Sequence, residues 1–180
     1  RSGIDLVMFP ELTLFGYPPG DLLERPSIVE HQNQKLSILI DQLPANVGCL
    51  FGCVEKNSER GKPYFNGAVF VYKNQVQQHF RKQLLPVYDV FDDSRHFEPG
   101  RMTENQFVFR GHKILVLVCE DMWGWDDLHP ENPMLPLAQE NFDVILNMSA
   151  SPFTKDKFLY RKKYGALTAQ HFSAPLMYTN

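Results

Sequence analysis

The chain has 180 residues, and 18 lysines and arginines against 21 aspartates and glutamates give a formal net charge of −3. Hydrophobic residues make up 43% of the sequence and charged residues 22%, as in an ordinary globular domain rather than a disordered or fibrous chain. A near-neutral charge without a long lysine and arginine stripe argues against a nucleic-acid-binding protein.

The apolar runs and the cysteines argue against further classes of protein. Apolar runs such as 114–118 are about a quarter of the roughly 20 residues that a membrane-spanning helix needs, and no signal peptide is visible. The three cysteines are an odd number and match no zinc or redox spacing. The sequence therefore predicts a cytoplasmic protein with neither a membrane nor a nucleic acid as partner.

The first part of the chain predicts a strand and then a helix. Residues 5–9 form a short apolar run that ends at Pro10, as in a buried strand that stops where a backbone donor is lost. Apolar residues at helical spacing predict a helix over 28–43, and Ser27 with Glu30 is interpreted as its capping box.

The middle of the chain reads as strands separated by a tight turn and a long loop. Three runs rich in valine and phenylalanine predict strands at 48–55, 67–72 and 75–80. Lys73-Asn74 is interpreted as a hairpin turn between the last two. The stretch 84–100 is polar and irregular, and loops of this length inside a compact domain tend to be functional.

The last third alternates again between strands and helices. A strand pair at 107–109 and 113–118, turned at Gly111-His112, precedes a loop at 123–136, a strand at 143–147, a helix at 154–172 and a strand at 176–178. Strands followed by helices predict an α/β fold built in layers, as one domain over 1–180. Both ends fall beside predicted core strands, so we expect a fragment of a larger polypeptide.

Reactive side chains lie at the exits of three predicted strands. The chain has no glycine-rich nucleotide loop, paired-histidine zinc helix or Gly-x-Ser-x-Gly elbow. Glu11, however, follows the first strand, Lys82 follows the hairpin strand, and Cys119 follows the apolar run 114–118. Held at the edge of an apolar core, these side chains suit the roles of general base, oxyanion-stabilising cation and nucleophile.

Each of these residues also has a non-catalytic interpretation. Most glutamates and lysines are simply solvated, and a free cysteine is more often an inert core residue. Cys49 and Cys53 fit that core interpretation because each lies inside a predicted strand. Cys119 differs, because the chain turns polar directly after it, and a strand exit beside a base is expected to favour its thiolate.

In the order Glu, Lys, Cys, the three residues resemble the triad of the nitrilase, or carbon–nitrogen hydrolase, superfamily. Four blocks between residues 5 and 163 carry the resemblance: Phe9-Pro10-Glu11-Leu12 with Gly16-Tyr17-Pro18, Lys82 with Leu85-Pro86 and Tyr88, Val118-Cys119-Glu120-Asp121 with Trp123, and Asn147-Met148-Ser149-Ala150-Ser151-Pro152-Phe153. The blocks are most similar to the branch formed by the glutaminase domains of glutamine-dependent NAD synthetases.

This resemblance implies a fold and a reaction. The fold is an α-β-β-α sandwich, here incomplete, with an N-terminal strand and helix and a C-terminal part absent. Glu11 takes the thiol proton of Cys119, which attacks the carboxamide carbon of glutamine. Lys82 and the backbone N–H of Glu120 hold the oxyanion, and water activated by Glu11 then releases glutamate from the thioester.

The resemblance also implies which residues bind glutamine. Tyr88, Glu120 and Ser151 match the family's substrate-binding positions. Lys157 stands where the family usually has a basic residue, often arginine, and an ammonium there can pair with the α-carboxylate, though not bidentately. Many members carry a second glutamate shortly after the lysine, and no residue is assigned to that role here.

Two charged clusters are interpreted as loops without a part in the chemistry. A loop held by ion pairs is expected at Asp92, Asp93, Arg95 and Glu98. A solvated loop is expected at Asp126, Asp127, His129 and Glu131, because this cluster lacks the ligand spacing of a metal site. No metal is expected, and the chemistry requires none of the six histidines.

The resemblance implies partners beyond these residues. No cofactor is expected in this domain, whereas a synthetase domain following Asn180 would use ATP and magnesium to amidate deamido-NAD with the released ammonia. The superfamily also commonly forms homo-oligomers. Two alternatives stay open: a stand-alone amidase or nitrilase acting on another carbon–nitrogen bond, and a catalytically silent assembly domain, against which the intact set of Glu11, Lys82 and Cys119 argues.

Overall fold

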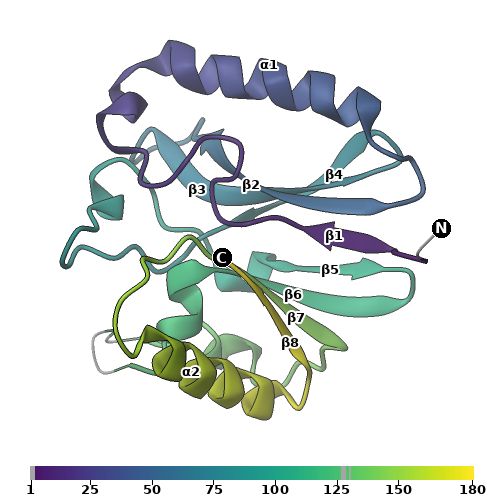
Figure 1. Ribbon diagram of the computed structural model, residues 1–180, viewed down its shortest axis with the longest axis vertical. Coiled ribbons are helices and arrows are strands. Elements are labelled where there is room, and N and C mark those ends of the chain that lie inside the picture. Colours follow the sequence, from purple (N-terminus) through teal and green to yellow (C-terminus); the bar gives the residue numbers. More distant parts are fainter. Residues whose placement is uncertain (1–2, 127–128, 130) are drawn as a thin grey trace.

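The computed structural model describes residues 3–126, 129 and 131–180, and they form four layers (Figure 1). Two four-stranded sheets face each other in the middle. The long helix α1 (Pro26–Gln42) covers the outer face of one sheet, and α2 (Lys157–Phe172) covers the outer face of the other. The expected α/β class and the α-β-β-α sandwich are confirmed.

The first sheet has the strand order β1-β2-β3-β4, with β1 at Leu6–Met8, β2 at Gly48–Lys56, β3 at Tyr64–Tyr72 and β4 at Gln75–Arg81. The strands β1 and β2 are parallel and joined by α1, whereas the other pairs are antiparallel. Lys73 and Asn74 have φ angles of 52° and 56°, as the predicted two-residue hairpin turn requires. The Asn74 amide also donates to carbonyls at the end of α1, which anchors the turn.

The second sheet has the order β5-β6-β7-β8, with β5 at Gln106–Phe109, β6 at His112–Val118, β7 at Val144–Met148 and β8 at Leu176–Thr179. The strands β6, β7 and β8 are parallel, and α2 forms the crossover between the last two. The β5–β6 turn lies at Arg110-Gly111, one residue earlier than predicted, with positive φ at both residues. Short 3-10 helices are η1 (Gly20–Glu24), η2 (Asp93–Arg95), η3 (Met102–Glu104), η4 (Cys119–Trp123) and η5 (Leu135–Leu137).

The central strands β2, β3 and β6 are buried on both faces over most of their length, which explains why they are almost continuously apolar. Between the sheets, aromatic side chains of β3 and β5 meet, with the rings of Phe70 and Phe107 4.6 Å apart. On the outer face of the first sheet, Cys49 and Cys53 pack beneath Leu36 of α1. Burial raises the pKa of both thiols, that of Cys53 to about 12. Their predicted place in the core is confirmed.

Two local expectations are wrong. The strand β1 is only half-buried rather than buried, because it lies at the edge of its sheet. The helix α1 begins at Pro26, two residues before the predicted start, and its N-cap is Arg25 without a side-chain cap. Ser27 therefore lies inside the helix and forms no capping box with Glu30, because proline already fixes the backbone of the first turn.

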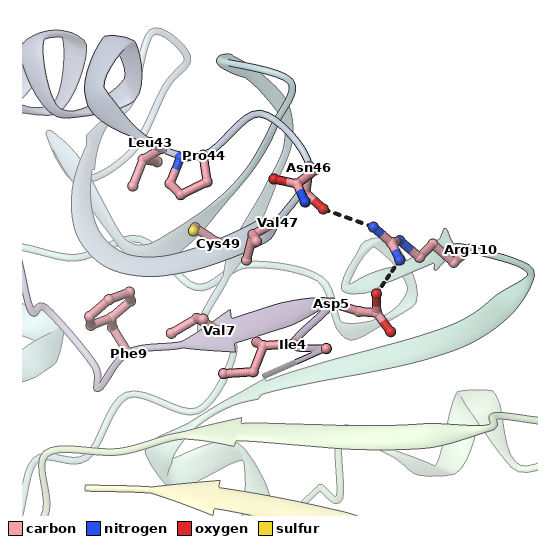
Figure 2. A pocket seen from close by; sticks show the side chains of 11 residues that line it. Ile4, Asp5, Val7, Phe9, Leu43, Pro44, Asn46, Val47, Cys49 and Arg110 are labelled. Carbon is pink, nitrogen blue, oxygen red and sulfur yellow. Dashed lines mark hydrogen bonds and ion pairs between the residues drawn. The ribbon is translucent and has the colours of Figure 1, made fainter. Parts of the chain in front are cut away.

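A cavity of about 790 Å³ opens between β1 and the C-terminal end of α1 (Figure 2). Val7 and Phe9 are among its apolar lining residues. Arg110 crosses its rim, where it donates hydrogen bonds to the Asp5 carboxylate and, at 2.8 Å, to the Asn46 carbonyl. In the part of the chain that the structure describes, no helix is long and apolar enough to cross a membrane.

Candidate active site

The three strand exits singled out in the sequence meet between the two sheets. Glu11 follows β1, Lys82 follows β4, and Cys119 opens η4 directly after β6. Their exposed fractions are 2%, 0% and 4%, so all three reactive groups are shielded from bulk water. None of them lines the 790 Å³ cavity, which is therefore a separate feature of the fold.

The Glu11 carboxylate is held by three donors from different parts of the fold. Its Oε1 accepts hydrogen bonds from Lys82 Nζ and from Asn66 Nδ2, both at 2.8 Å. Its Oε2 accepts one from the Ala150 backbone N–H at 3.1 Å. Because Ala150 follows β7, Glu11 joins the first sheet to the second at the candidate site. Sequence reasoning missed Asn66, since the interior of a strand gives no signal for such a contact.

Lys82 pairs with two carboxylates at once. Its Nζ lies 2.8 Å from Glu11 Oε1 and 2.7 Å from Asp93 Oδ2. Burial alone would lower the pKa of Lys82, but the charges of Glu11 and Asp93 outweigh burial and hold the pKa well above its usual range. The ammonium therefore stays protonated at neutral pH, as an oxyanion-stabilising group must.

Asp93 fits the expected loop held by ion pairs, but its partner is Lys82 of the candidate site. The side chain is 5% exposed and also accepts a hydrogen bond from the Tyr17 hydroxyl at 3.2 Å. The remainder of the loop fits the expectation better, because Arg95 pairs with Asp21 at 3.2 Å and with Glu24 at 2.5 Å. Nothing in the local sequence distinguishes Asp93 from its acidic neighbour, and its contact with Lys82 arises from how the loop folds through η2.

Cys119 combines a strained backbone with a buried thiol. Its φ of 48° lies in the left-handed region, which a residue with a Cβ adopts at a cost that the surrounding structure must offset. Burial raises the pKa of the Cys119 thiol and Glu11 adds to the increase, whereas Lys82, the Ser149 hydroxyl and the Ala150 N–H act in the opposite direction. The expected thiolate is therefore wrong for the free site, and a nucleophilic role for this thiol would require a base.

Tyr88 and Glu120, two of the predicted substrate residues, lie together. The Tyr88 hydroxyl donates to Glu120 Oε1 at 2.6 Å, and His129 Nε2 lies 2.8 Å from the same oxygen. Burial and then the Glu120 hydrogen bond raise the pKa of Tyr88, so this hydroxyl remains a donor. Glu120 is 4% exposed, so this hydrogen-bonded group lies in the interior, directly after Cys119 in the chain.

The acidic segment that includes His129 is not a simple solvated loop. The His129 side chain is 11% exposed because it packs on Glu120, so the expectation is wrong for this residue. Asp126 accepts a hydrogen bond from the Tyr164 hydroxyl at 2.7 Å, and Glu131 is exposed. Asp127 lies outside the described residues. Asp126 and His129 thus contact different parts of the domain.

Ser151 and Lys157, the other two predicted substrate residues, have different partners. Ser151 Oγ accepts a hydrogen bond from Arg161 Nη2 at 2.7 Å and donates one to Asn180 Oδ1 at 3.1 Å. Lys157 Nζ lies 4.1 Å from the centroid of the Trp123 ring, in a cation–π contact. Sequence reasoning missed Arg161, although its position four residues after Lys157 places both cations on one helix face.

Among the described residues, one group could offer three metal-ligand atoms close together. The ligand atoms of Asp21, Glu24 and His96 lie within 4.8 Å of one another. The Arg95 guanidinium, however, already pairs with both carboxylates of this exposed group. Neutralised carboxylates attract a cation weakly, so we assign no metal to these residues.

A family model described as carbon–nitrogen hydrolase matches residues 1–176. The chain belongs to the carbon–nitrogen hydrolase family. The match includes every strand exit described above and all strands up to the start of β8, so the family assignment rests on nearly the whole sandwich and not on one motif. Membership makes the chain part of an enzyme of this family.

Curated relatives extend this carbon–nitrogen hydrolase assignment. The chain is 36% identical over 187 residues to a glutamine-dependent NAD(+) synthetase of Synechocystis sp., with 99% of this chain and 33% of the relative aligned. It is 35% identical to a protein of the same name from Thermotoga maritima, with 99% of this chain and 30% of that relative aligned. The chain thus spans about a third of the length of these relatives.

Solved structures of carbon–nitrogen hydrolases agree with the fold. A glutamine-dependent NAD+ synthetase from Acinetobacter baumannii superposes with a TM-score of 0.79 at 34% identity, covering 93% of this chain and 30% of that one. A nitrilase-superfamily amidase from Nesterenkonia superposes with a TM-score of 0.68 at 17% identity, covering 94% of this chain and 60% of that one. The second likeness supports the fold alone.

Proposed function

We propose that this domain hydrolyses glutamine to glutamate and ammonia. The ammonia then serves the ATP- and magnesium-dependent amidation of deamido-NAD by a synthetase domain outside these residues. The observation that carries the proposal is the buried Lys82–Glu11 pair beside Cys119, in a chain 36% identical to a protein named glutamine-dependent NAD(+) synthetase.

In the first half of the reaction, Cys119 Sγ attacks the carboxamide carbon of glutamine. Because burial keeps the thiol protonated, its proton must move as the bond forms, and Glu11 is the base that receives it. The carbonyl oxygen becomes an oxyanion, which the Lys82 ammonium and the backbone N–H of Glu120 stabilise. Collapse of this intermediate breaks the carbon–nitrogen bond, and Glu11 returns the proton to the departing ammonia.

The second half hydrolyses the thioester that joins the glutamyl group to Cys119. Glu11, again ionised, takes a proton from a water molecule whose oxygen attacks the thioester carbon. The same two donors stabilise the second oxyanion, and the thiolate leaves and regains its proton from Glu11. The products are glutamate and the free enzyme.

The polar groups around the triad suit an amino-acid amide. The Glu120 carboxylate, fixed by Tyr88 and His129, presents negative charge that complements the α-ammonium group of glutamine. Lys157 at the start of α2 and the Ser151 hydroxyl suit the α-carboxylate. These four residues, Tyr88, Glu120, Ser151 and Lys157, are therefore proposed to select glutamine over amides that lack charged groups.

A panel of amides tests this proposal. Full-length protein is incubated separately with glutamine, asparagine and an uncharged amide such as propionamide, and ammonia release is measured with Cys119→Ala as the control. We expect turnover of glutamine, at least about tenfold slower turnover of the others, and none in the control. Turnover of propionamide without glutamine would indicate a stand-alone amidase, and a folded protein inactive on all three would indicate a silent domain.

A further inference from the structure

We propose that Asp121 is a positioning residue that fixes Lys82 and Cys119 relative to each other across the two sheets. The inference deepens the proposed glutaminase function and rests on it. Asp121 touches neither the reacting atoms nor the substrate in this account, and it acts through the backbone segments that carry the cation and the nucleophile.

The Asp121 carboxylate is fully buried and accepts three backbone hydrogen bonds. Its Oδ1 accepts from the N–H groups of Gln83 and Leu84, at 3.0 and 2.9 Å. Its Oδ2 accepts from the N–H of Val118 at 3.0 Å. Gln83 and Leu84 directly follow Lys82, and Val118 directly precedes Cys119, so one carboxylate holds both chain segments.

The Gln83 and Leu84 bonds cross from one sheet to the other. Lys82 continues β4 of the first sheet, whereas Asp121 belongs to η4, which follows β6 of the second sheet. The backbone of Lys82 is otherwise tied to its own side of the molecule, through its N–H to the Asn66 carbonyl and its carbonyl to the Gly100 N–H, both at 2.8 Å. Asn105, which precedes the second sheet, holds the backbone of Arg81 just before Lys82. Asp121 supplies the polar link on the other side of Lys82, directly to the Cys119 turn.

The chemistry of the contact requires a carboxylate. Three N–H donors converge on the side chain, and only an ionised carboxylate presents acceptors on both oxygens. Asparagine would have to turn an NH₂ group toward at least one of these donors. Burial raises the pKa of Asp121 to about 6, while the N–H groups of Leu84 and Val118 act against the increase, so the residue is ionised at neutral pH. A small shift of Lys82 away from the oxyanion position costs rate rather than substrate affinity.

The test compares Asp121→Asn with wild type in the full-length protein. Asp143→Asn is the matched control, because Asp143 Oδ2 also accepts from a backbone N–H, that of Lys113 at 2.7 Å, at the opposite end of β6. Cys119 is labelled with 2-chloroacetamide, and mass spectrometry maps the label. The time course gives the labelling rate, and the fraction of Cys119 labelled at completion gives the fraction of protein molecules with a competent site. Glutamine turnover then gives KM and kcat per competent site.

For Asp121→Asn we expect complete labelling of Cys119. The labelling rate per competent site should fall about tenfold to a hundredfold, because the Lys82 charge that favours the Cys119 thiolate moves away, and kcat per competent site should fall to a similar extent. We expect KM for glutamine to stay within about threefold of wild type, and Asp143→Asn to match wild type throughout. A purely structural Asp121 would instead lower the number of competent sites while each remaining site kept its normal rates. Rates per site within about twofold of wild type would overturn the inference.

A second variant covers the case in which Asp121→Asn does not fold. Leu84→Pro removes the Leu84 backbone N–H, one of the three donors, and leaves the Asp121 carboxylate in place. Because two of the three hydrogen bonds remain, we expect the labelling rate per competent site to fall only several-fold. An unchanged rate would overturn the inference. If wild type is labelled at Cys119 but does not hydrolyse glutamine, the proposed function is contradicted, and the labelling rates of the variants still decide the role of Asp121.

Discussion

At the scale of single residues, the candidate site places one ammonium between two carboxylates. Lys82 Nζ is 2.8 Å from Glu11 and 2.7 Å from Asp93, and all three side chains are buried. Charges this far from water are stable only when they are paired, and removing one partner of such a pair typically costs about 3–5 kcal/mol. Because Lys82 has a second partner in Asp93, loss of Glu11 and loss of Lys82 have different consequences.

Glu11→Gln and Lys82→Ala are both expected to lower glutamine turnover at least about a hundredfold, since one removes the proton shuttle and the other the oxyanion cation. Thermal unfolding should distinguish them. Glu11→Gln leaves Lys82 paired with Asp93, whereas Lys82→Ala leaves two buried carboxylates without a counter-charge and lowers the melting temperature more. Exposed Lys35 on α1 provides the control variant Lys35→Ala. Near-normal turnover in either site variant, with unchanged circular dichroism, would refute that residue's role.

The cysteines give a second prediction at this scale. A diazo-ketone analogue of glutamine should label Cys119 alone, because its electrophilic carbon is delivered to the thiol beside Glu11. Cys49 and Cys53 lie under α1 in the apolar core, and the pKa of Cys53, raised to about 12 by burial, keeps that thiol unreactive. Peptide mapping by mass spectrometry identifies the modified residue, and modification of either core cysteine would contradict the assignment of the nucleophile.

At the scale of elements, an ion pair fixes the strand that delivers Lys82. Arg81, the last residue of β4, donates to the Glu55 carboxylate of β2 at 2.6 and 3.1 Å, and its guanidinium stacks 4.1 Å from the Phe65 ring centre. Burial acts to raise the pKa of Glu55, but hydrogen bonds from His79 and Arg81 outweigh it and lower the pKa to about 2. The end of β4 is thus tied across the sheet immediately before the candidate site.

This contact predicts a pH-dependent loss of stability. The folded pKa of Glu55, about 2, lies below its ordinary value of 4.5, so its contribution is complete above pH 4.5 and is lost as the pH falls toward 2. The Glu55→Gln variant should therefore be less stable than wild type at pH 7. The free energies of unfolding of the two proteins should become equal near pH 2. Thermal unfolding followed by circular dichroism at several pH values measures the difference. A constant difference down to pH 2 would contradict this account of the pair.

Periodicity and strand exits were sufficient to predict most elements and to single out three residues that the structure brings together. Glu11, Lys82 and Cys119 each follow an apolar run, and such a run ends where the chain leaves the core. Asp93 and Arg161 could not be predicted in this way, because their contacts with Lys82 and Ser151 depend on how a loop and a helix pack. The predicted element boundaries were wrong at short turns, because a single glycine or proline there determines the backbone conformation.

At the scale of the whole molecule, the two sheets meet at the candidate site through polar contacts as well as through an apolar core. Glu11 of the first sheet accepts from Ala150 of the second, and Asp121 of the second accepts from Gln83 and Leu84 beside the first. The proposed base and cation thus follow strands of the first sheet, and the proposed nucleophile follows a strand of the second. The proposed reaction therefore requires the assembled sandwich. The chain also spans about a third of its relatives' length.

The most direct test of the central claim compares nitrogen donors in the full-length protein. With ATP, magnesium and deamido-NAD present, NAD formation is measured from glutamine and from ammonium, for wild type and for Cys119→Ala. If Cys119 serves only to release ammonia, the variant loses synthesis with glutamine and keeps synthesis with ammonium. Equal loss with both donors would mean that Cys119 is structural, and equal retention with both would mean that the nucleophile lies elsewhere.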